Sequence, residues 1–278
     1  MRKLGLIGFP VAHSASPGMQ RAALDHANLG DWTYELWPTP NQELPMRIAA
    51  IRADDAVAGF NITIPHKQAI VPFLDSVSTH ARAIGAVNTV VKSAGVLSGD
   101  NTDWRGFLAD LDWNRIATPA GSVALVLGAG GSARAIVYAL LNRKVRVRVL
   151  NRDIKRAHVL ALALRPHGDV SVIDAVDSVI DSAALIINCT SAGMEPNNHT
   201  SPWPDRAPFP AHATLYDLVY KPRVTVVMRQ VQAAGIRAVG GIGMLAEQGA
   251  AAFELWTGVG AASVSGVMRR AIGDISTS

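Results

Sequence analysis

The feature that most constrains this chain is an apolar run that leads directly into a glycine-rich turn. Val123–Leu127 contains only apolar residues, and the six residues that follow, from Gly128 to Ala133, read Gly-Ala-Gly-Gly-Ser-Ala. A continuous apolar run is typical of a parallel strand buried on both faces. A G-x-G-x-x-A pattern between such a strand and a helix is typical of a dinucleotide-binding domain. The segment therefore predicts a strand, a turn and a helix that runs to Arg143.

Each small residue of the turn has a physical role in this interpretation. Gly128 would permit the tight turn, Gly130 would let a pyrophosphate approach the backbone, and Ala133 would keep helix and strand close. The N–H groups at the start of the helix would face the phosphates. The alternative interpretation is a glycine turn with a purely structural role.

Apolar runs and helical periodicity alternate along nearly the whole chain, which predicts an α/β fold with parallel strands. In the first part we expect strands at 3–8, 33–37, 59–64 and 86–91, followed by a hairpin. In the second part we expect strands at 123–127, 146–150, 170–173, 185–188, 214–218 and 238–239. The remaining segment, 244–275, has the length and apolar content of two helices, which we expect to pack on the first domain.

The composition fits two compact domains. The chain has 278 residues, of which 49% are hydrophobic, enough to fill two cores. Its one cysteine, Cys189, cannot form an internal disulfide, and the sequence holds neither a signal peptide nor the roughly 20 apolar residues of a membrane span. We therefore expect a cytoplasmic protein that does not insert into a membrane.

Charge and histidine spacing argue against two further classes of protein. The net charge of +4 is modest and its basic residues are spread along the chain, whereas nucleic-acid binding usually needs a denser basic face. The eight histidines lack a ligand spacing such as H-x-x-x-H. We expect no nucleic-acid partner and no metal site.

The end of the second Rossmann strand bears on the choice of cofactor. An NAD-selective domain usually places Asp or Glu there to hold the ribose 2′-hydroxyl, but this chain has Asn151-Arg152, with Lys155 and Arg156 one helical turn on. Arginine suits a 2′-phosphate, so we favour NADP over NAD or dual use. Asp153 would repel a phosphate, although it also stands where the next helix needs an N-cap.

Three polar segments fall at strand ends or turns in the first part, where a rigid sheet can aim side chains at a ligand. They are 13–17, 61–67 and 99–103, with 85–89 between the last two, and together they offer hydroxyls, amides, one lysine and one carboxylate. This set suits a small polyhydroxylated substrate. Each segment also has a structural interpretation. Ser16-Pro17 is an ordinary helix entry capped by serine, Asn88 and Asn101 are typical turn residues, and Lys67 alone reads as a solvated helix lysine.

Taken together, the motifs resemble the shikimate dehydrogenase family along nearly the whole chain. They follow the order of that family: GFPVAHSASP at 8–17, GFNITIPHK at 59–67, IGAVNT at 84–89, GDNTD at 99–103, GAGG at 128–131, Asn151-Arg152, NCTSAGM at 188–194, YDLVYKP at 216–222 and GMLAEQ at 243–248. The resemblance implies a substrate domain at 1–105 and 243–278, with a Rossmann domain inserted at 106–242. It also implies a cleft between them that holds substrate against the nicotinamide.

The resemblance further implies a set of site residues. Ser14 and Ser16 would contact a substrate carboxylate, and the substrate's ring hydroxyls would be held by Thr63, Asn88, Asp103, Tyr220 and Gln248. The cofactor would be bound by Gly128, Ala129, Gly130, Gly131, Ser132, Ala133, Asn151, Arg152, Arg156, Thr190, Leu218 and Gly241. Lys67 and Asp103 would form the catalytic pair. Oxidation of a secondary alcohol requires a group that takes the hydroxyl proton, and we expect Lys67 to be that group.

The implied reaction is the reversible, NADP-dependent reduction of 3-dehydroshikimate to shikimate. The chain departs from the family pattern at Gln20-Arg21, which stand where a His-Asn pair is usual. It departs also at Gly240-Gly241, in place of Asp-Gly, and at Asp153, in place of threonine. Two alternatives therefore stay open. One is a paralogue that acts on quinate or aminoshikimate, with NAD or both cofactors. The other is a dinucleotide-binding sensor without turnover.

Overall fold

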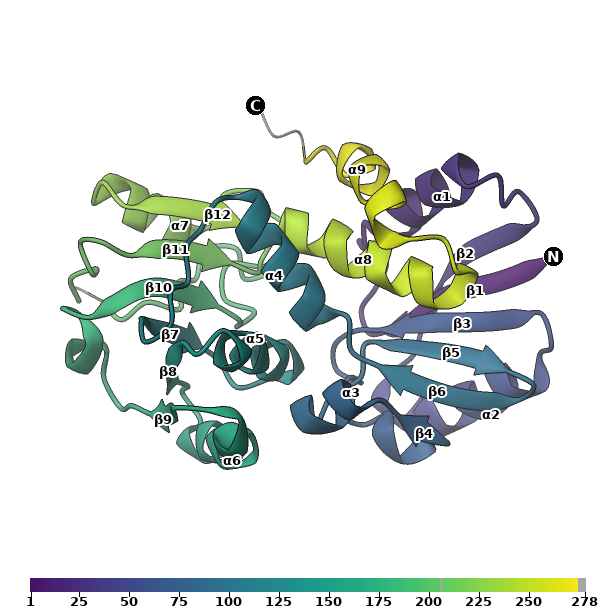
Figure 1. Ribbon diagram of the computed structural model, residues 1–278, viewed down its shortest axis with the longest axis horizontal. Coiled ribbons are helices and arrows are strands. Elements are labelled where there is room, and N and C mark those ends of the chain that lie inside the picture. Colours follow the sequence, from purple (N-terminus) through teal and green to yellow (C-terminus); the bar gives the residue numbers. More distant parts are fainter. Residues whose placement is uncertain (206, 275–278) are drawn as a thin grey trace. The chain divides into compact units, whose positions relative to one another are not determined.

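The computed structural model describes residues 1–205 and 207–274, and the chain forms two compact units. Unit 1 comprises Met1–Gly106 and Leu245–Ser278, and unit 2 comprises Phe107–Met244. Residues 275–278, which we expected at the end of the substrate domain, lie outside the described residues. The chain leaves unit 1 within helix α4 (Asp103–Trp113) and returns within helix α8 (Ile242–Thr257), as the colours of Figure 1 show.

Unit 1 is built on a six-stranded mixed sheet with the order β2-β1-β3-β5-β6-β4. The strands are β1 (Arg2–Gly8), β2 (Trp32–Pro38), β3 (Val57–Ile62), β4 (Ser76–Val77), β5 (Thr89–Ser93) and β6 (Val96–Asp100). β1 pairs in parallel with β2 and β3, whereas β5 pairs in antiparallel fashion with both β3 and β6. The hairpin of β5 and β6 is the one expected after Val91.

Helices cover both faces of this sheet. They are α1 (Ser16–His26), α2 (Leu44–Ala53), α3 (Thr79–Ile84), α8 and α9 (Ala261–Ala271), with short 3₁₀ turns η1 (Asn41–Glu43) and η2 (Val71–Phe73). In β1, Leu4 packs in one apolar cluster with Trp256 of α8, and Ile7 packs in another with Ile48 of α2. Side chains separated by an odd number of strand positions point to opposite faces, so α2 and α8 lie on opposite faces of the sheet.

The two C-terminal helices pack on unit 1, as expected for the segment 244–275. Phe253 of α8 and Val264 and Met268 of α9 are fully buried in one cluster with Met19 of α1. The described helices end at Ala271. The return of α8 to unit 1 brings Gln248 to the sheet that carries Lys67.

Unit 2 has six strands, all parallel, in the order β12-β11-β10-β7-β8-β9. They are β7 (Val123–Leu127), β8 (Arg146–Leu150), β9 (Val170–Val172), β10 (Ala183–Asn188), β11 (Thr214–Asp217) and β12 (Arg237–Gly240). Read from β9, this is the Rossmann order 3-2-1-4-5-6. The expected α/β class with a Rossmann-type sheet is therefore confirmed.

The helices of unit 2 are α5 (Gly131–Asn142), α6 (Ile154–Leu164) and α7 (Val226–Ala233), with 3₁₀ turns η3 (Arg165–His167) and η4 (Val176–Val179). α5 packs on β7 and β8, whereas Val227 and Val231 of α7 share a core with Leu125 and Leu215. In the part of the chain that the structure describes, no helix is both long and apolar enough to cross a membrane.

The predicted strands differ from the observed ones mainly in unit 1. The strand predicted at 86–91 is observed as β5, which begins only at Thr89. The amides of Val87 and Asn88 donate instead to the carbonyls of Lys67 and Asp100. Strand 59–64 begins at Val57 and ends at Ile62, before the turn that carries the cis Ile64–Pro65 bond. The two-residue strand β4 was not predicted, since two residues are too few to show a period of two.

Candidate functional site

Lys67 lies in a turn that follows β3, and its side chain is largely buried. Its backbone carbonyl accepts a hydrogen bond from the amide of Val87 at 2.7 Å, which fixes the turn against the chain that enters β5. The side chain is only 12% exposed. The interpretation of Lys67 as a solvated helix lysine is therefore wrong. A lysine in this position requires an acceptor, because a buried ammonium without one is costly.

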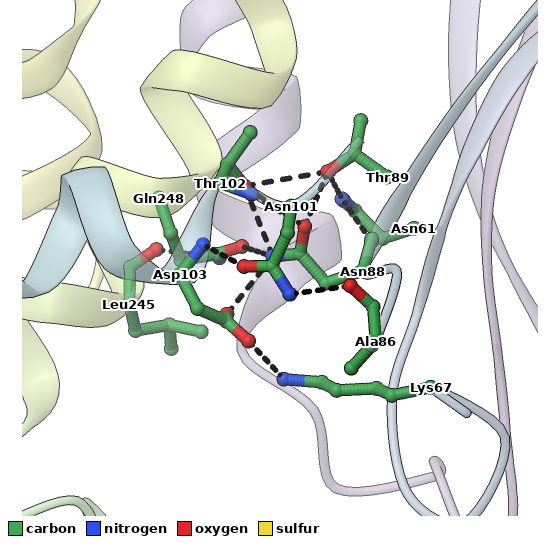
Figure 2. Close-up of polar contacts among 10 residues, drawn as sticks. All are labelled: Asn61, Lys67, Ala86, Asn88, Thr89, Asn101, Thr102, Asp103, Leu245 and Gln248. Carbon is green, nitrogen blue, oxygen red and sulfur yellow. Dashed lines mark hydrogen bonds and ion pairs between the residues drawn. The ribbon is translucent and has the colours of Figure 1, made fainter. Parts of the chain in front are cut away.

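Asp103 supplies that acceptor, 36 residues away in the sequence. Lys67 Nζ lies 2.6 Å from Asp103 Oδ2, and the carboxylate is 5% exposed (Figure 2). Asp103 is the first residue of α4, and its backbone amide donates to Asn101 Oδ1 at 3.0 Å. Asn101 is fully buried and donates to the carbonyl of Ala86. Asn101 is thus a turn residue, as one interpretation expected, and the turn holds Asp103.

Asn88 holds the second carboxylate oxygen, with Asn88 Nδ2 2.9 Å from Asp103 Oδ1. The amide oxygen of Asn88 accepts from the backbone N–H of Thr102 at 2.7 Å. Because a backbone N–H can only donate, the Asn88 amide nitrogen must face Asp103. Asn88 is 2% exposed and serves as more than a turn residue.

Gln248 joins this group from α8. Its Oε1 lies 3.2 Å from Asn88 Nδ2, and its own amide donates to the carbonyl of Leu245 (Figure 2). α4 and α8 approach closely here: a Cβ on Gly106 would stand 2.6 Å from the backbone nitrogen of Gln248. Glycine at position 106 is therefore required for Gln248 to reach Asn88.

The predicted carboxylate-binding residues lie at the start of α1. Ser14 Oγ donates to Ser16 Oγ at 3.1 Å. Ser16 does not cap α1, because the N-cap is Ala15, and the Ser16 amide donates to Ser14 Oγ at 3.2 Å. The interpretation of Ser16 as an N-cap is therefore wrong. Thr63 lies in the turn between β3 and Lys67, and its amide donates to the carbonyl of Ile7.

The position of Gln20 explains one departure from the family pattern. Its side chain is fully buried, and Nε2 donates to the carbonyl of Gly249 at 3.2 Å, between α1 and α8. Gln20 therefore takes part in helix packing. At another departure, a Cβ on Gly240 would meet Arg223 O at 3.7 Å, an ordinary contact that leaves room for a side chain.

In unit 2, the glycine-rich turn connects β7 to α5. Gly128 has φ +110°, and a Cβ there would stand 3.2 Å from the carbonyl of Cys189 and from Thr190 Cγ2. A Cβ on Gly130 would meet nothing within 4 Å, and Gly130, which has no side chain, is the N-cap of α5. Gly128 thus has a structural reason to be glycine, and the open space at Gly130 fits the approach of a pyrophosphate.

Other predicted cofactor residues meet at the carboxyl ends of neighbouring strands. Thr190 donates to Asn188 Oδ1 from its amide at 2.9 Å and from its hydroxyl at 2.7 Å, and Leu218 donates to the Asn188 carbonyl at 3.0 Å. A Cβ on Gly241 would stand 2.8 Å from Leu218 Cα. This edge is where ligands bind in open parallel α/β sheets.

A buried carboxyl group, Asp217, stabilises this edge. It accepts hydrogen bonds from Asn188 Nδ2 at 2.8 Å, the Val219 amide at 3.0 Å and the Thr225 hydroxyl at 2.6 Å. Burial raises the pKa of Asp217, and the three hydrogen bonds oppose the rise. The Asp217 carboxyl group therefore holds β10, the loop after β11 and the start of α7 together by hydrogen bonds.

At the end of β8, Asp153 is the N-cap of α6, as expected. Its carboxylate accepts from the amides of Lys155 at 3.1 Å and Arg156 at 3.4 Å, and it lies 3.4 Å from Arg156 Nε. These donors offset the charge that would repel a phosphate. Arg152 and Arg156 are both exposed, whereas Asn151 is half-buried and donates to the Asp153 carbonyl at 2.7 Å.

The remaining predictions have simpler outcomes. Tyr220 lies in unit 2, three residues after β11, and its assignment to the substrate stays a prediction. Conversely, sequence reasoning assigned no role to Asn61, Thr89 and Thr102, which are buried around Asn88 (Figure 2). Tyr34 was missed as well. For Tyr34, Asn61 and Thr89 the signal was a polar group within a predicted strand, whereas Thr102 lies outside the predicted strands.

Comparison with known families covers most of the chain. Residues 6–90 match the shikimate dehydrogenase substrate binding domain. Residues 114–197 match the shikimate / quinate 5-dehydrogenase family, and residues 241–272 match the shikimate 5′-dehydrogenase C-terminal domain. The three matches fall in the same order as the motifs.

Individual relatives extend the similarity to nearly full length. The chain is 41% identical over 265 residues to the shikimate dehydrogenase (NADP(+)) of Symbiobacterium thermophilum, covering 92% of this chain and 89% of the relative. The shikimate 5-dehydrogenase of Thermus thermophilus, solved with NADP(H) and shikimate, is 40% identical with a TM-score of 0.86, covering 98% and 100%. The ligand-free 5-ketofructose reductase of a Gluconobacter species is 29% identical with a TM-score of 0.80, covering 97% and 98%.

Proposed function

Because the chain belongs to the shikimate dehydrogenase family, we propose that it interconverts 3-dehydroshikimate and shikimate with NADP. The observation that carries this proposal is the buried pair of Lys67 and Asp103, 2.6 Å apart, with Asn88 and Gln248 beside it. A cation, a carboxylate and two amides on rigid elements can hold ring hydroxyls and move one proton.

Unit 1 acts as the substrate domain in this proposal. Ser14 and Ser16 bind the substrate carboxylate with their hydroxyl groups. Thr63, Asn88, Asp103 and Gln248 hold the ring hydroxyls, and the family resemblance assigns Tyr220 to the same ligand. The contacts of Asn88 and Asp103 support this assignment, because hydrogen bonds within the protein already fix both residues. Such preorganisation reduces the entropic cost of binding.

Unit 2 acts as the dinucleotide domain. A bound nicotinamide dinucleotide would supply the hydride chemistry of the reaction in both directions. The turn from Gly128 to Ala133 holds the pyrophosphate at the start of α5, and Thr190, Leu218 and Gly241 line the strand ends beside it. Arg152 and Arg156 bind the 2′-phosphate, and Asn151 lines the adenosine end. We also propose that the protein is cytoplasmic. Its single cysteine, Cys189, cannot form an internal disulfide, which fits a reducing compartment.

Lys67 handles the proton. As the alcohol is oxidised, its hydroxyl proton must leave, and a group within hydrogen-bond reach must take it. Lys67 takes this proton as a neutral amine, becomes an ammonium, and returns the proton when the ketone is reduced. Asp103 fixes the lysine side chain, with its Oδ2 2.6 Å from Lys67 Nζ, and so keeps the lysine facing the hydroxyl that loses its proton. Asn88 keeps Asp103 in place, so that its second oxygen stays directed at Lys67.

A panel of three substrates and two cofactors tests the proposal. Shikimate, quinate and aminoshikimate would each be assayed with NADP and NAD, and kcat/KM would be compared across the six combinations. We expect the highest value for shikimate with NADP. A higher value for quinate or aminoshikimate would identify a paralogue, and NADP binding without turnover of any substrate would identify a sensor.

A further inference from the structure

Asn188 is the last residue of β10, and the proposed function gives it no role. Its side chain is fully buried in unit 2. It lies at the edge where Thr190, Leu218 and Gly241 are assigned to the cofactor. A buried amide is costly unless its donors and acceptors are paired, so the partners of Asn188 indicate what its side chain holds.

The amide oxygen of Asn188 holds Thr190. It accepts two hydrogen bonds from that residue, one from the backbone N–H at 2.9 Å and one from the hydroxyl at 2.7 Å. Because a backbone N–H can only donate, the amide oxygen must be the atom that faces Thr190. The Thr190 hydroxyl accepts in turn from the amide of Ala192 at 3.1 Å. Asn188 therefore fixes both the backbone and the side chain of Thr190.

The amide nitrogen of Asn188 holds the end of the neighbouring strand. It donates to Oδ1 of Asp217, the last residue of β11, at 2.8 Å, and to the carbonyl of Ala192 at 3.4 Å. Asp217 Oδ1 also accepts from the amide of Val219 at 3.0 Å. Leu218 stands between these two residues, and its amide donates to the backbone carbonyl of Asn188 at 3.0 Å. Asn188 and Asp217 together therefore fix Leu218.

The two residues held in this way pack closely against glycines of the cofactor edge. A Cβ on Gly241 would stand 2.8 Å from Leu218 Cα, and a Cβ on Gly128 would stand 3.2 Å from Thr190 Cγ2 and from the carbonyl of Cys189. Contacts this close leave no free space between the neighbours. A shift of Thr190 or Leu218 would therefore disturb the glycine turn that is assigned to the pyrophosphate.

We propose that Asn188 is a positioning residue for the dinucleotide, which holds Thr190 and, with Asp217, Leu218 at the separation that the cofactor requires. The inference rests on the proposed function, which assigns Thr190 and Leu218 to the cofactor. Position 188 must present an acceptor toward Thr190 and a donor toward Asp217 at the same time. An amide meets both requirements, whereas an ionised aspartate of the same shape can only accept and leucine can do neither.

The test is Asn188→Asp, which keeps the shape and the acceptor toward Thr190 but replaces the donor toward Asp217 by an oxygen. We expect the Kd for NADP, measured by isothermal titration calorimetry at about pH 9, to rise about tenfold, because two carboxylates repel each other. The Kd for NAD should rise by the same factor, since the 2′-phosphate is assigned to Arg152 and Arg156. The KM for shikimate should stay within about twofold of wild type.

The same titration at lower pH sharpens the test. The ratio of the variant's Kd for NADP to that of wild type should be smallest at about pH 5, where the two carboxyl groups can share one proton and restore a hydrogen bond. A ratio of one at every pH between these values would overturn the inference.

A reciprocal exchange tests whether the two side chains act through their direct contact. Asn188→Asp/Asp217→Asn places the carboxylate at 188 and the amide at 217, so the hydrogen bond can form with donor and acceptor exchanged. The Kd for NADP at about pH 9 should be at least about threefold lower than in Asn188→Asp alone. A Kd no lower than that of Asn188→Asp would contradict the inference.

Tyr216→Phe is the matched control. Tyr216 precedes Asp217 in β11 and is fully buried, but its hydroxyl donates to Asp110 Oδ2 at 2.5 Å. Its loss should lower the melting temperature while the Kd for NADP stays within about twofold of wild type. If Tyr216→Phe and Asn188→Asp raise that Kd equally, the effect at Asn188 is general destabilisation and the inference fails.

Thr225→Val keeps the inference testable even if Asn188→Asp does not fold. The Thr225 hydroxyl donates to Asp217 Oδ2 at 2.6 Å, and Thr225 is not among the residues assigned to the cofactor. Its loss loosens Asp217 on the side away from Asn188, so we expect about threefold increases in the Kd values for both NADP and NAD. An unchanged Kd for both cofactors would then overturn the inference.

The outcomes distinguish failure of this inference from failure of the proposed function. If wild type binds neither NADP nor NAD, the proposed function and the inference fail together. If wild type binds NADP and Asn188→Asp binds it equally well at every pH, only the role of Asn188 is wrong.

Discussion

The two units differ in what their candidate sites are made of. In unit 1 the site consists of side chains, with Lys67, Asp103 and Asn88 bonded to one another at 2.6–2.9 Å. In unit 2 the site consists largely of backbone, where Gly128 and Gly130 shape a turn at the start of α5. Side chains can recognise an arrangement of hydroxyl groups, whereas backbone N–H groups recognise the phosphates that NAD and NADP share.

This difference predicts opposite responses to substitution. Removal of a side-chain functional group should impair the site of unit 1. Addition of a methyl group to the backbone turn should impair cofactor binding by unit 2. The preference for NADP over NAD should depend on neither kind of substitution, because we assign it to Arg152 and Arg156, the exposed arginines after β8.

The largest effect is expected from Lys67→Ala. It should lower kcat about 1,000-fold, because proton transfer by a positioned group contributes roughly 10²–10⁴ to rates. The KM for shikimate should change by less than about threefold. Lys92→Met is the control, because Lys92 is also buried in unit 1 but donates to the carbonyl of Asp54. Steady-state kinetics of both variants checks the prediction, and near-normal turnover of Lys67→Ala would exclude Lys67 as the proton carrier.

Methyl groups on the glycine turn should produce the next largest effect. Gly130→Ala should raise the KM for NADP at least about tenfold without lowering the melting temperature, because its Cβ meets no protein atom and would occupy space needed by the pyrophosphate. Gly128→Ala should raise the KM and also lower the melting temperature, because φ is +110° there. Calorimetry and NADP titration separate the two. Equal melting temperatures for both variants would contradict this account of Gly128.

A smaller effect is expected at the end of β8. Arg152→Ala should raise the KM for NADP about tenfold and leave the KM for NAD within about twofold, because a charge-assisted contact to the 2′-phosphate is lost. Asp153→Ser keeps an N-cap residue and removes a negative charge, so it should lower the KM for NADP about twofold. Kinetics with both cofactors checks these values. An equal loss with NAD and NADP would mean that Arg152 does not contact the 2′-phosphate.

The smallest effect concerns pH, and it contrasts two carboxyl groups of unit 2. The pKa of Asp217 is raised by burial, so its contribution favours the folded state at low pH and is lost as pH rises above about 4 through the raised pKa. The melting temperature of Asp217→Asn, relative to wild type, should therefore increase from pH 4 to pH 7.

Asp169→Asn is the control for this pH series. Arg148 holds the pKa of Asp169 below its usual range by a hydrogen bond and by its charge. Its contribution is therefore complete above about pH 4 and is lost only as pH falls below that value. Relative to wild type, Asp169→Asn should show no trend from pH 4 to pH 7. Parallel curves for the two variants would contradict the assignment of a raised pKa to Asp217.

The sequence was most informative where structure depends on neighbours in the chain. The strands Val123–Leu127 and Arg146–Leu150 were predicted with the bounds that they have. Continuous apolar runs and a glycine turn are local signals, as is the N-cap at Asp153. Strand ends in unit 1 were predicted less well, because backbone groups such as the amide of Val87 bond to a distant segment.

The sequence by itself determined the α/β order, the Rossmann turn and the residues offered for chemistry, because each follows from local patterns and motifs. Only the tertiary structure decided how those residues are used. It placed Lys67 beside Asp103, made Ser16 a partner of Ser14 instead of a helix cap, and joined Tyr34 to Asn61. The physical reason is that a buried polar side chain must find a partner, and partners from distant strands and helices meet only when the sheet assembles.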